Sequence, residues 1–193
     1  MSELLINSIR KLVSLTDTEA NMVKAAVQIR RVRRNQLLTE PGITASYEHF
    51  IIKGCCRKFY LDSGGVEHTL GFASEGWWMT DLESFFTGQP AKYYTECLED
   101  GEVVTLEKKV LDELFLKIPS LNVFFRMLYQ NAIVAQNERL LNVISIKSDE
   151  HYIRFKEKYP QLQNRLPQYL IASYLGITPE FFSRMKTRIT LNS

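Results

Sequence analysis

Hydrophobic residues recur along this chain with two different periods. Over the first 26 residues they lie three or four positions apart, as Leu5, Ile9 and Leu12 do, which predicts short helices, and Thr16 is a suitable N-cap for the second one. From about residue 27 to residue 106 the pattern changes to short β-like runs separated by Pro-Gly, Ser-Gly and Asp-Gly turn signals. This part is predicted to form an antiparallel sandwich or barrel with flanking helices.

A helical period returns after the last predicted strand. Pro119 ends a short helix, and Ser120 caps a long one that continues to about residue 146. The apolar residues of this long helix cannot share one narrow stripe, so we expect one face to cover the β-domain and another to meet a second subunit. The expected dimer contacts are Phe124, Leu128 and Ala135. A helix buried within a monomer is the alternative, and the polar residues between positions 130 and 139 weigh against it.

The segment from residue 168 to residue 187 has the spacing of a helix-turn-helix. Gly176 lies where a tight turn between two helices requires a residue without a side chain. Core and capping positions around it are filled by Ile171, Leu175, Thr178, Phe182 and Met185.

The outward face of the second helix in this segment has the chemistry of a DNA-reading surface. Arg184 can donate two hydrogen bonds to a guanine edge, while Glu180, four residues earlier, accepts from cytosine or orients that arginine. Lys186 and Arg188 suit phosphate contacts. The full set of expected DNA-binding residues is Thr178, Pro179, Glu180, Ser183, Arg184, Lys186 and Arg188. The alternative is an ordinary helical hairpin in which Glu180 and Arg184 form a surface ion pair.

Charge is distributed unevenly, although the chain as a whole carries only +2. Residues 147–193 hold eight Lys and Arg against four Asp and Glu, whereas residues 1–146 hold 16 against 18. The basic charge therefore coincides with the predicted DNA-binding segment, as a nucleic-acid partner requires. The 193 residues with 45% hydrophobic content exclude collagenous and disordered classes. Neither a signal peptide nor a membrane-spanning apolar run is recognisable, so a cytoplasmic location without membrane contact is expected.

The order of these elements resembles the Crp/Fnr family of bacterial transcription regulators over essentially the whole chain. The specific match is the segment from Thr178 to Met185 (TPEFFSRM), which is similar to that family's recognition helix, and residues 151–161 resemble the helix before it. The resemblance implies an α+β fold: an N-terminal antiparallel β jelly-roll, like a cyclic-nucleotide-binding domain, with flanking helices (1–119), a long dimerisation helix (120–146) and a C-terminal helix-turn-helix domain (147–193). It also implies a homodimer on a near-palindromic promoter site in double-stranded DNA, with RNA polymerase as a further partner.

The segment that matches the family's cyclic-nucleotide cassette departs from its pattern. Thr80 replaces the glycine that approaches the ligand, Lys92 stands near the arginine position, and Tyr93 follows where a small hydroxyl is wanted. A lysine does not reproduce the bidentate phosphate clamp of an arginine. Cyclic AMP is therefore not an expected cofactor, and an unidentified small-molecule effector is left open. Its expected pocket residues are Trp78, Thr80, Asp81, Lys92 and Tyr93; the alternative makes the aromatic residues here plain β-domain core.

Other chemistry is weakly represented. Cys55, Cys56 and Cys97 are too few for an iron–sulfur cluster, and the favoured interpretation makes them structural, with a redox-sensing Cys55/Cys56 pair as the alternative. No metal site and no catalytic motif is recognisable, so an enzyme is not expected. Two alternatives to a ligand-controlled DNA-binding regulator remain open: a nucleotide- or small-molecule-binding signalling module that acts through protein contacts, and a constitutive regulator without an effector.

Overall fold

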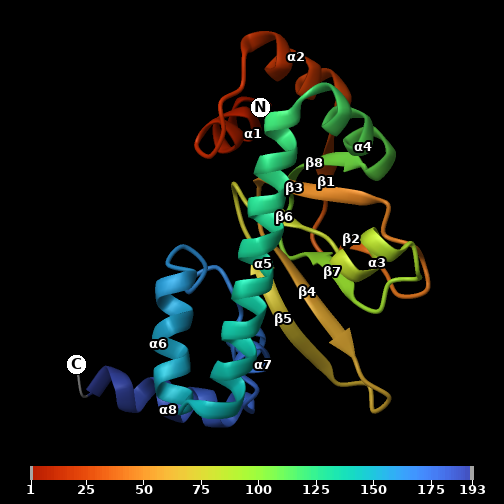
Figure 1. Ribbon diagram of the computed structural model, residues 1–193. Coiled ribbons are helices and arrows are strands. Elements are labelled where there is room, and N and C mark those ends of the chain that lie inside the picture. The colour runs from red at the N-terminus through yellow and green to blue at the C-terminus, as the bar shows by residue number, and fades with distance from the viewer. Residues whose placement is uncertain (1, 192–193) are drawn as a thin grey trace.

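The computed structural model describes residues 2–191, and its centre is a pair of antiparallel sheets (Figure 1). The first sheet has the order β1-β8-β3-β6 and the second the order β2-β7-β4-β5. The strands are β1 (Gln28–Val32), β2 (Leu37–Thr39), β3 (Tyr47–Lys53), β4 (Cys56–Leu61), β5 (Glu67–Ala73), β6 (Trp78–Met79), β7 (Tyr94–Cys97) and β8 (Gly101–Glu107). We call the two facing sheets the β-roll. The predicted jelly-roll is thus confirmed.

Helices lie on both sides of the β-roll. They are α1 (Ser2–Arg10), α2 (Asp17–Ala26), α3 (Leu82–Thr87), α4 (Lys108–Lys117), α5 (Pro119–Ser145), α6 (Ser148–Lys158), α7 (Gln168–Leu175) and α8 (Pro179–Leu191). Thr16 caps α2 in a reciprocal capping box with Glu19, as its sequence indicates. Within the described residues 2–191, no helix combines the length and the apolar content that crossing a bilayer requires.

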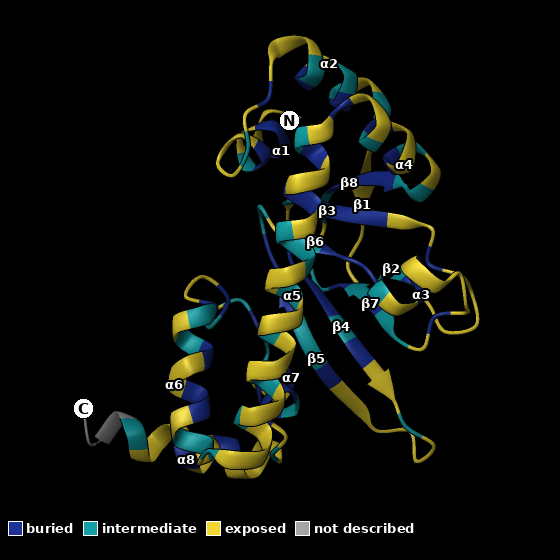
Figure 2. Cartoon of the chain, viewed as in Figure 1, coloured by how far each residue is buried: buried dark blue, intermediate teal, exposed yellow. Residues whose placement is uncertain are grey.

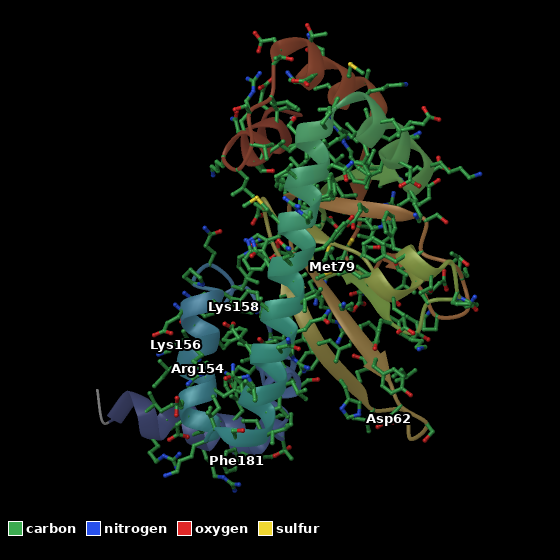
Figure 3. All side chains as sticks on the ribbon, viewed as in Figure 1. Asp62, Met79, Arg154, Lys156, Lys158 and Phe181 are labelled. Atoms are coloured by element: carbon green, nitrogen blue, oxygen red, sulfur yellow. The ribbon has the colours of Figure 1, made fainter. Side chains whose placement is uncertain are left out.

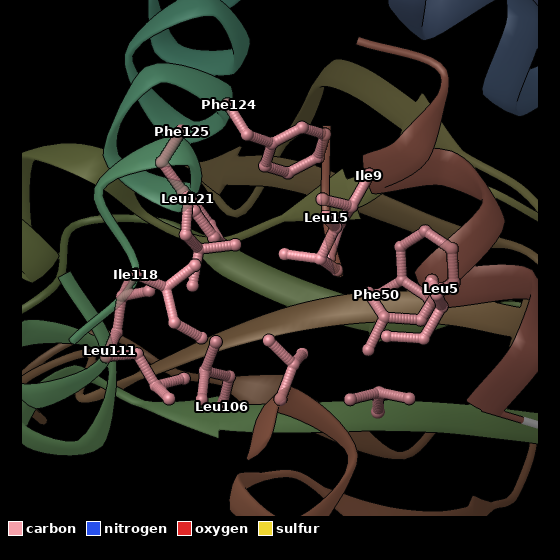
Figure 4. Close-up of a cluster of buried hydrophobic side chains, with 14 of the residues drawn as sticks. Leu5, Ile9, Leu15, Phe50, Leu106, Leu111, Ile118, Leu121, Phe124 and Phe125 are labelled. Carbon is pink, nitrogen blue, oxygen red and sulfur yellow. The ribbon is translucent and has the colours of Figure 1, made fainter. Parts of the chain in front are cut away.

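Alternation along the strands divides the buried residues into three cores. Phe50 and Val104 point outward from the first sheet into a core closed by α1, α2, α4 and the first half of α5 (Figure 4). Their neighbours Ile51 and Val103 point the other way, into a smaller core between the two sheets. A third core joins α6, α7 and α8 to Phe72 on the outer face of the second sheet.

Helix α5 is buried over its first turns and exposed over its second half (Figure 2). Leu121, Phe124 and Phe125 lie in the first core. Beyond Tyr129 most side chains face solvent on one side and α6 and α7 on the other. The helix therefore connects the β-roll to the C-terminal helices (Figure 1).

A buried carboxyl group fixes α5 against the first sheet. Glu48 on β3 is 1% exposed, and the Tyr129 hydroxyl donates to its Oε1 at 3.0 Å. Burial raises the pKa of Glu48 to about 8, an effect that the Tyr129 hydrogen bond only partly offsets. Near neutral pH the side chain is therefore largely protonated, and its ionisation opposes the packing of α5.

Stability is expected to fall as the pH rises, because the pKa of Glu48 is higher in the folded chain than in the unfolded one. The favourable contribution of the protonated side chain is complete below about pH 4 and is lost as the pH rises through about 8. Glu48→Gln removes this dependence. Urea unfolding at pH 6 and pH 9 measures the free energy of unfolding of both proteins. The free energy of the variant, relative to that of the wild type, should be higher at pH 9 than at pH 6 by roughly 1 to 3 kcal/mol.

The matched control is Glu113→Gln, which changes an exposed carboxyl on α4 that pairs with Lys117. It should leave the pH profile unchanged. Equal profiles for wild type and Glu48→Gln would show that Glu48 is ionised in the folded protein at neutral pH, contrary to this account.

Candidate nucleic-acid interface and its docking on the β-roll

Helices α7 and α8 are joined by a tight turn whose geometry follows from the sequence. Gly176 has a left-handed backbone, with φ 73°, and its N–H donates to the carbonyls of Ala172 and Ser173. The Ile177 N–H also donates to Ala172, which completes a helix-ending motif that favours glycine. Thr178 then caps α8, because its Oγ1 accepts from the Phe181 N–H at 3.2 Å. The predicted roles of Gly176 and Thr178 are confirmed.

One face of α8 is buried and the other is exposed. Phe182 and Met185 belong to the third core, and the Phe182 ring meets the Tyr152 ring of α6 edge to face at 5.2 Å. All seven residues expected to contact DNA are exposed: Thr178, Pro179, Glu180, Ser183, Arg184, Lys186 and Arg188. The structure therefore brings this set together on one accessible helix face.

The charged residues on this face differ in how strongly they are held. Hydrogen bonds from its own backbone N–H and from Thr178, with Arg184 nearby, lower the pKa of Glu180, so this residue is ionised at neutral pH. Arg188 donates to both carboxylate oxygens of Asp149 on α6, at 2.7 and 2.6 Å. An exposed pair of this kind contributes at most about 1 kcal/mol, so a DNA phosphate can compete for Arg188.

Phe181 is an exposed aromatic residue on α8 that sequence reasoning did not assign. Its side chain is 39% exposed, and it lies at the end of the molecule formed by α8 (Figure 3). Because Phe182 takes the core position, the adjacent phenylalanine must point outward. The doubled phenylalanine was the signal available in the sequence. An exposed apolar ring of this kind suits contact with a thymine methyl group.

An aromatic cluster holds the C-terminal helices against the second sheet. The Phe72 ring of β5 lies 6.2, 5.8 and 5.7 Å from the rings of Phe155, Tyr159 and Tyr174. Ser173 on α7 adds two hydrogen bonds to β5: its Oγ donates to the Glu67 carbonyl and accepts from the Thr69 N–H. Helices α6 and α7 are therefore docked on the β-roll of their own chain.

Arg165 ties the same helices to two loops of the β-roll. Its guanidinium donates to Glu75 at 2.9 and 3.0 Å and to Glu99 at 2.7 and 3.0 Å. The hydrogen bonds to these carboxylates, Glu99 first, hold the pKa of Arg165 above its usual range. Arg165 lies between α6 and α7, and we call its paired hydrogen bonds to Glu75 and Glu99 the Arg165 fork. From the sequence alone it was an isolated basic residue with no recognisable partner.

The five expected effector residues are neighbours in the fold, since the Lys92 N–H donates to Asp81, but their side chains have different partners. The Trp78 ring packs on Phe50 and Phe125 at 5.2 and 5.1 Å, so it belongs to the first core. The Thr80 hydroxyl donates to the Tyr47 carbonyl. Lys92 is exposed and pairs with Glu83.

Asp81 and Tyr93 have different roles again. Asp81 is buried and caps α3, accepting from the backbone N–H groups of Ser84 and Lys92 at 3.3 and 3.2 Å. Its carboxylate therefore takes the place at the helix N-terminus where a bound phosphate would otherwise sit. The centre of the Tyr93 ring lies 5.5 Å from the Nζ atom of Lys58. Burial lowers the pKa of Lys58, and Asp81 partly offsets this. Lys58 is thus a half-buried basic residue near these groups that sequence reasoning missed.

The three expected dimer contacts lie on the covered side of α5. Phe124 and Leu128 pack in the first core, and Ala135 faces α6 and α7. The exposed side of the helix carries another set, spaced alternately three and four residues apart: Gln130, Ile133, Asn137, Leu140 and Ile144. Ile133, Leu140 and Ile144 are 56%, 59% and 72% exposed. The expectation for Phe124, Leu128 and Ala135 is thus corrected, because the side of the helix available to a partner is the opposite one.

The two neighbouring cysteines point into different cores, Cys55 just before β4 and Cys56 at its first position. Cys55 points into the third core and Cys56 into the core between the sheets, where its Sγ lies 3.7 Å from Cys97 Sγ on β7. Burial raises the pKa of Cys55 to about 12. The alternative of a Cys55/Cys56 redox pair is therefore wrong. Over residues 2–191, His, Cys, Asp and Glu side chains form no group suited to a metal ion.

Comparison with known proteins agrees with this architecture. Residues 29–117 match the family model of the cyclic nucleotide-binding domain. No curated protein matches the chain in sequence. Among solved structures, the c-di-GMP-responsive global regulator CLP of Xanthomonas campestris is 12% identical, with a TM-score of 0.74 over 92% of this chain and 93% of its own.

Two further solved structures extend the comparison. The catabolite activator protein of Thermus thermophilus is 17% identical, with a TM-score of 0.59 over 93% of this chain and 85% of its own. FixK2 of Bradyrhizobium japonicum is 16% identical, with a TM-score of 0.71 over 86% and 85%. The β-roll thus has the fold of a cyclic nucleotide-binding domain. The resemblance of the chain to Crp/Fnr regulators is confirmed, and at these identities what is shared is the fold.

The Arg165 fork gives a direct test of docking. Arg165→Gln leaves Glu75 and Glu99 facing each other without a cation, which should weaken docking by about 2 kcal/mol, a reduced value because the groups are partly exposed. Hydrogen exchange of the β5 and α7 amides should accelerate roughly thirtyfold, while exchange in β3 and β8 stays unchanged. Arg31→Gln, which removes the ion pair of the almost fully exposed Arg31 with Glu102, serves as control. Unchanged exchange in β5 and α7 would contradict this role for Arg165.

Proposed function

We propose that this protein is a sequence-specific DNA-binding transcription regulator that acts as a homodimer on a near-palindromic site. The observation that carries the proposal is the outward face of α8, where Glu180, Ser183 and Arg184 are all exposed on a helix anchored from behind by Phe182 and Met185. A rigid helix with polar and basic side chains on its free face fits the major groove. The excess of basic residues after position 146 favours the same partner.

Within this proposal the recognition residues divide into two groups. Arg184 reads a base, with Glu180 orienting it or accepting from cytosine, and Phe181 adds an apolar contact. Lys186 and Arg188 bind phosphates, and Arg188 leaves Asp149 to do so. Thr178, Pro179 and Ser183 determine how closely the N-terminus of the helix approaches the DNA. Residues 147–193 thus form the DNA-binding unit, residues 120–146 the dimer helix and residues 1–119 the sensor.

The exposed stripe of α5 supports a dimer formed by helix pairing. Its alternating three- and four-residue spacing is that of a coiled-coil seam, with Ile133, Leu140 and Ile144 as apolar contacts. Asn137 lies in the middle of the seam, where a single polar residue fixes register and partner number. Two recognition helices would then be related by a two-fold axis, which matches a palindromic site.

We further propose that cyclic AMP does not control this regulator. Asp81 places a carboxylate at the N-terminus of α3, and Lys92 points to the surface toward Glu83 rather than into the β-roll. A cyclic phosphate there would meet a like charge instead of an arginine fork. Tight binding of cyclic AMP in a calorimetric titration, with a raised melting temperature, would overturn this part of the proposal.

DNA recognition is tested by selecting a site from a random DNA pool and measuring two variants on it. Arg184→Ala should weaken binding to the selected site by about 1–3 kcal/mol and flatten the preference for one base pair. Lys186→Ala should weaken all sequences alike and lower the salt dependence of binding. Fluorescence anisotropy over a salt series measures both. A selection that enriches no palindromic motif would refute the proposed function.

The dimer is tested on the exposed stripe. Leu140→Glu combined with Ile144→Glu places four carboxylates at the seam of a dimer and should give a folded monomer by analytical ultracentrifugation. Asn131→Glu adds a charge at an exposed position on another side of α5 and should remain dimeric. A dimer that survives the double substitution would show that its interface lies elsewhere.

A further inference from the structure

A cavity of about 600 Å³ opens between the second half of α5, the helix α6 and Tyr174 on α7. It lies outside the β-roll and apart from the outward face of α8. Its volume is in the range of small-molecule sites. Residues from α5 and α6, the two helices that meet at positions 146 and 147, form most of its wall.

Three cations contribute to the wall of this cavity. Arg139 comes from α5. Arg154 and Lys158 come from α6 (Figure 3). Arg154 is held by Asn142 at 2.8 Å and by Glu150 at 2.6 Å. Burial lowers the pKa of Lys158, and its neighbour Glu138 partly offsets this. The carboxylates that line the cavity are Glu138 and Glu157.

Arg139 is the group whose surroundings most require an anion. It is partly buried, and within residues 2–191 no carboxylate forms an ion pair with it. It donates to the Thr69 carbonyl at 2.8 Å and lies 5.3 Å from the Tyr174 ring centre, but its buried Nε has no hydrogen-bond partner among the described residues. A cation withdrawn from water without an anion is destabilising, and a bound anion relieves this.

His151 supplies a second unsatisfied donor or acceptor in the same wall. It is 2% exposed, and its Nε2 has no partner in the described part of the chain. Phe155 and Tyr174 add aromatic surface beside these polar groups. A ligand site typically combines unpaired polar groups with aromatic walls. A surface that only solvent covers does not require buried polar groups of this kind.

We infer that this cavity binds a small organic phosphate. A phosphate monoester carries close to two negative charges at neutral pH and can accept from more than one cation, as Arg139 and Lys158 on opposite walls require. The volume and the aromatic rings leave room for an organic part. The ligand would link α5 to α6, and any effect on the orientation of α8 rests on the proposed function, whereas binding itself does not.

Isothermal titration of the whole protein in the absence of DNA tests the site. The probes are adenosine 5′-monophosphate, adenosine as the uncharged analogue, and inorganic phosphate as the anion alone. We expect the monophosphate to bind and adenosine not to. Arg139→Gln and Lys158→Gln should each weaken binding about tenfold or more, because each removes a charge-assisted hydrogen bond.

The matched control is Arg126→Gln, an exposed arginine in the first half of α5, which should leave binding unchanged. Lys158→Gln keeps the test valid if loss of the Arg139 bond to Thr69 impairs folding. Three results would overturn the site: no binding by the wild type, equal binding by all variants, or loss of binding only on Arg184→Ala, which would place the anion on α8. A variant that loses phosphate binding but keeps its selected DNA site would leave the proposed function intact.

Discussion

Six of the helices, α1, α2 and α4 to α7, lie where the outer face of a sheet needs a cover. The β-roll buries little between its two sheets, where the core contains Ile51, Val103 and small residues such as Ala73. The larger apolar side chains point outward, Phe50 from the first sheet and Phe72 from the second, and each must be removed from water by a helix. The first sheet is covered by α1, α2, α4 and the start of α5, and the second by α6 and α7.

This constraint explains why one helix has three environments. The first half of α5 serves the core of the first sheet, so its apolar residues are buried. Its second half runs past the edge of that sheet and separates into a side toward α6 and α7 and a side toward solvent. A helix that is longer than the sheet it covers has apolar residues beyond the sheet that its own chain does not bury. Pairing with a second copy of the chain is the simplest way to bury them.

The sequence predicted elements better than it predicted partners. Capping and turn residues act locally, so Thr16, Gly176 and Thr178 could be assigned from their neighbours in the chain. Phe124 and Leu128 were misassigned because a helix with two apolar sides does not reveal which side its own chain covers. Arg165 is 66 positions from Glu99 and 90 positions from Glu75 in the sequence, and Tyr129 is 81 positions from Glu48. No periodicity in the sequence reveals contacts over such separations.

Buried polar groups have different surroundings in the β-roll and at the junction of α5 and α6. In the β-roll the buried charges are compensated internally: Asp81 is saturated by backbone N–H groups, and Glu48 is largely protonated at neutral pH. At the junction of α5 and α6, Arg139 and His151 keep buried nitrogens without partners in the described chain, as His49 and Trp78 do in the β-roll, but the pair at the junction lines a cavity. Buried polar groups are normally satisfied, so an unsatisfied pair in the wall of a cavity supports the ligand site that we infer there. The anion site that we infer therefore lies at the joint between α5 and α6, outside the β-roll, where a cavity and unpaired buried nitrogens occur together.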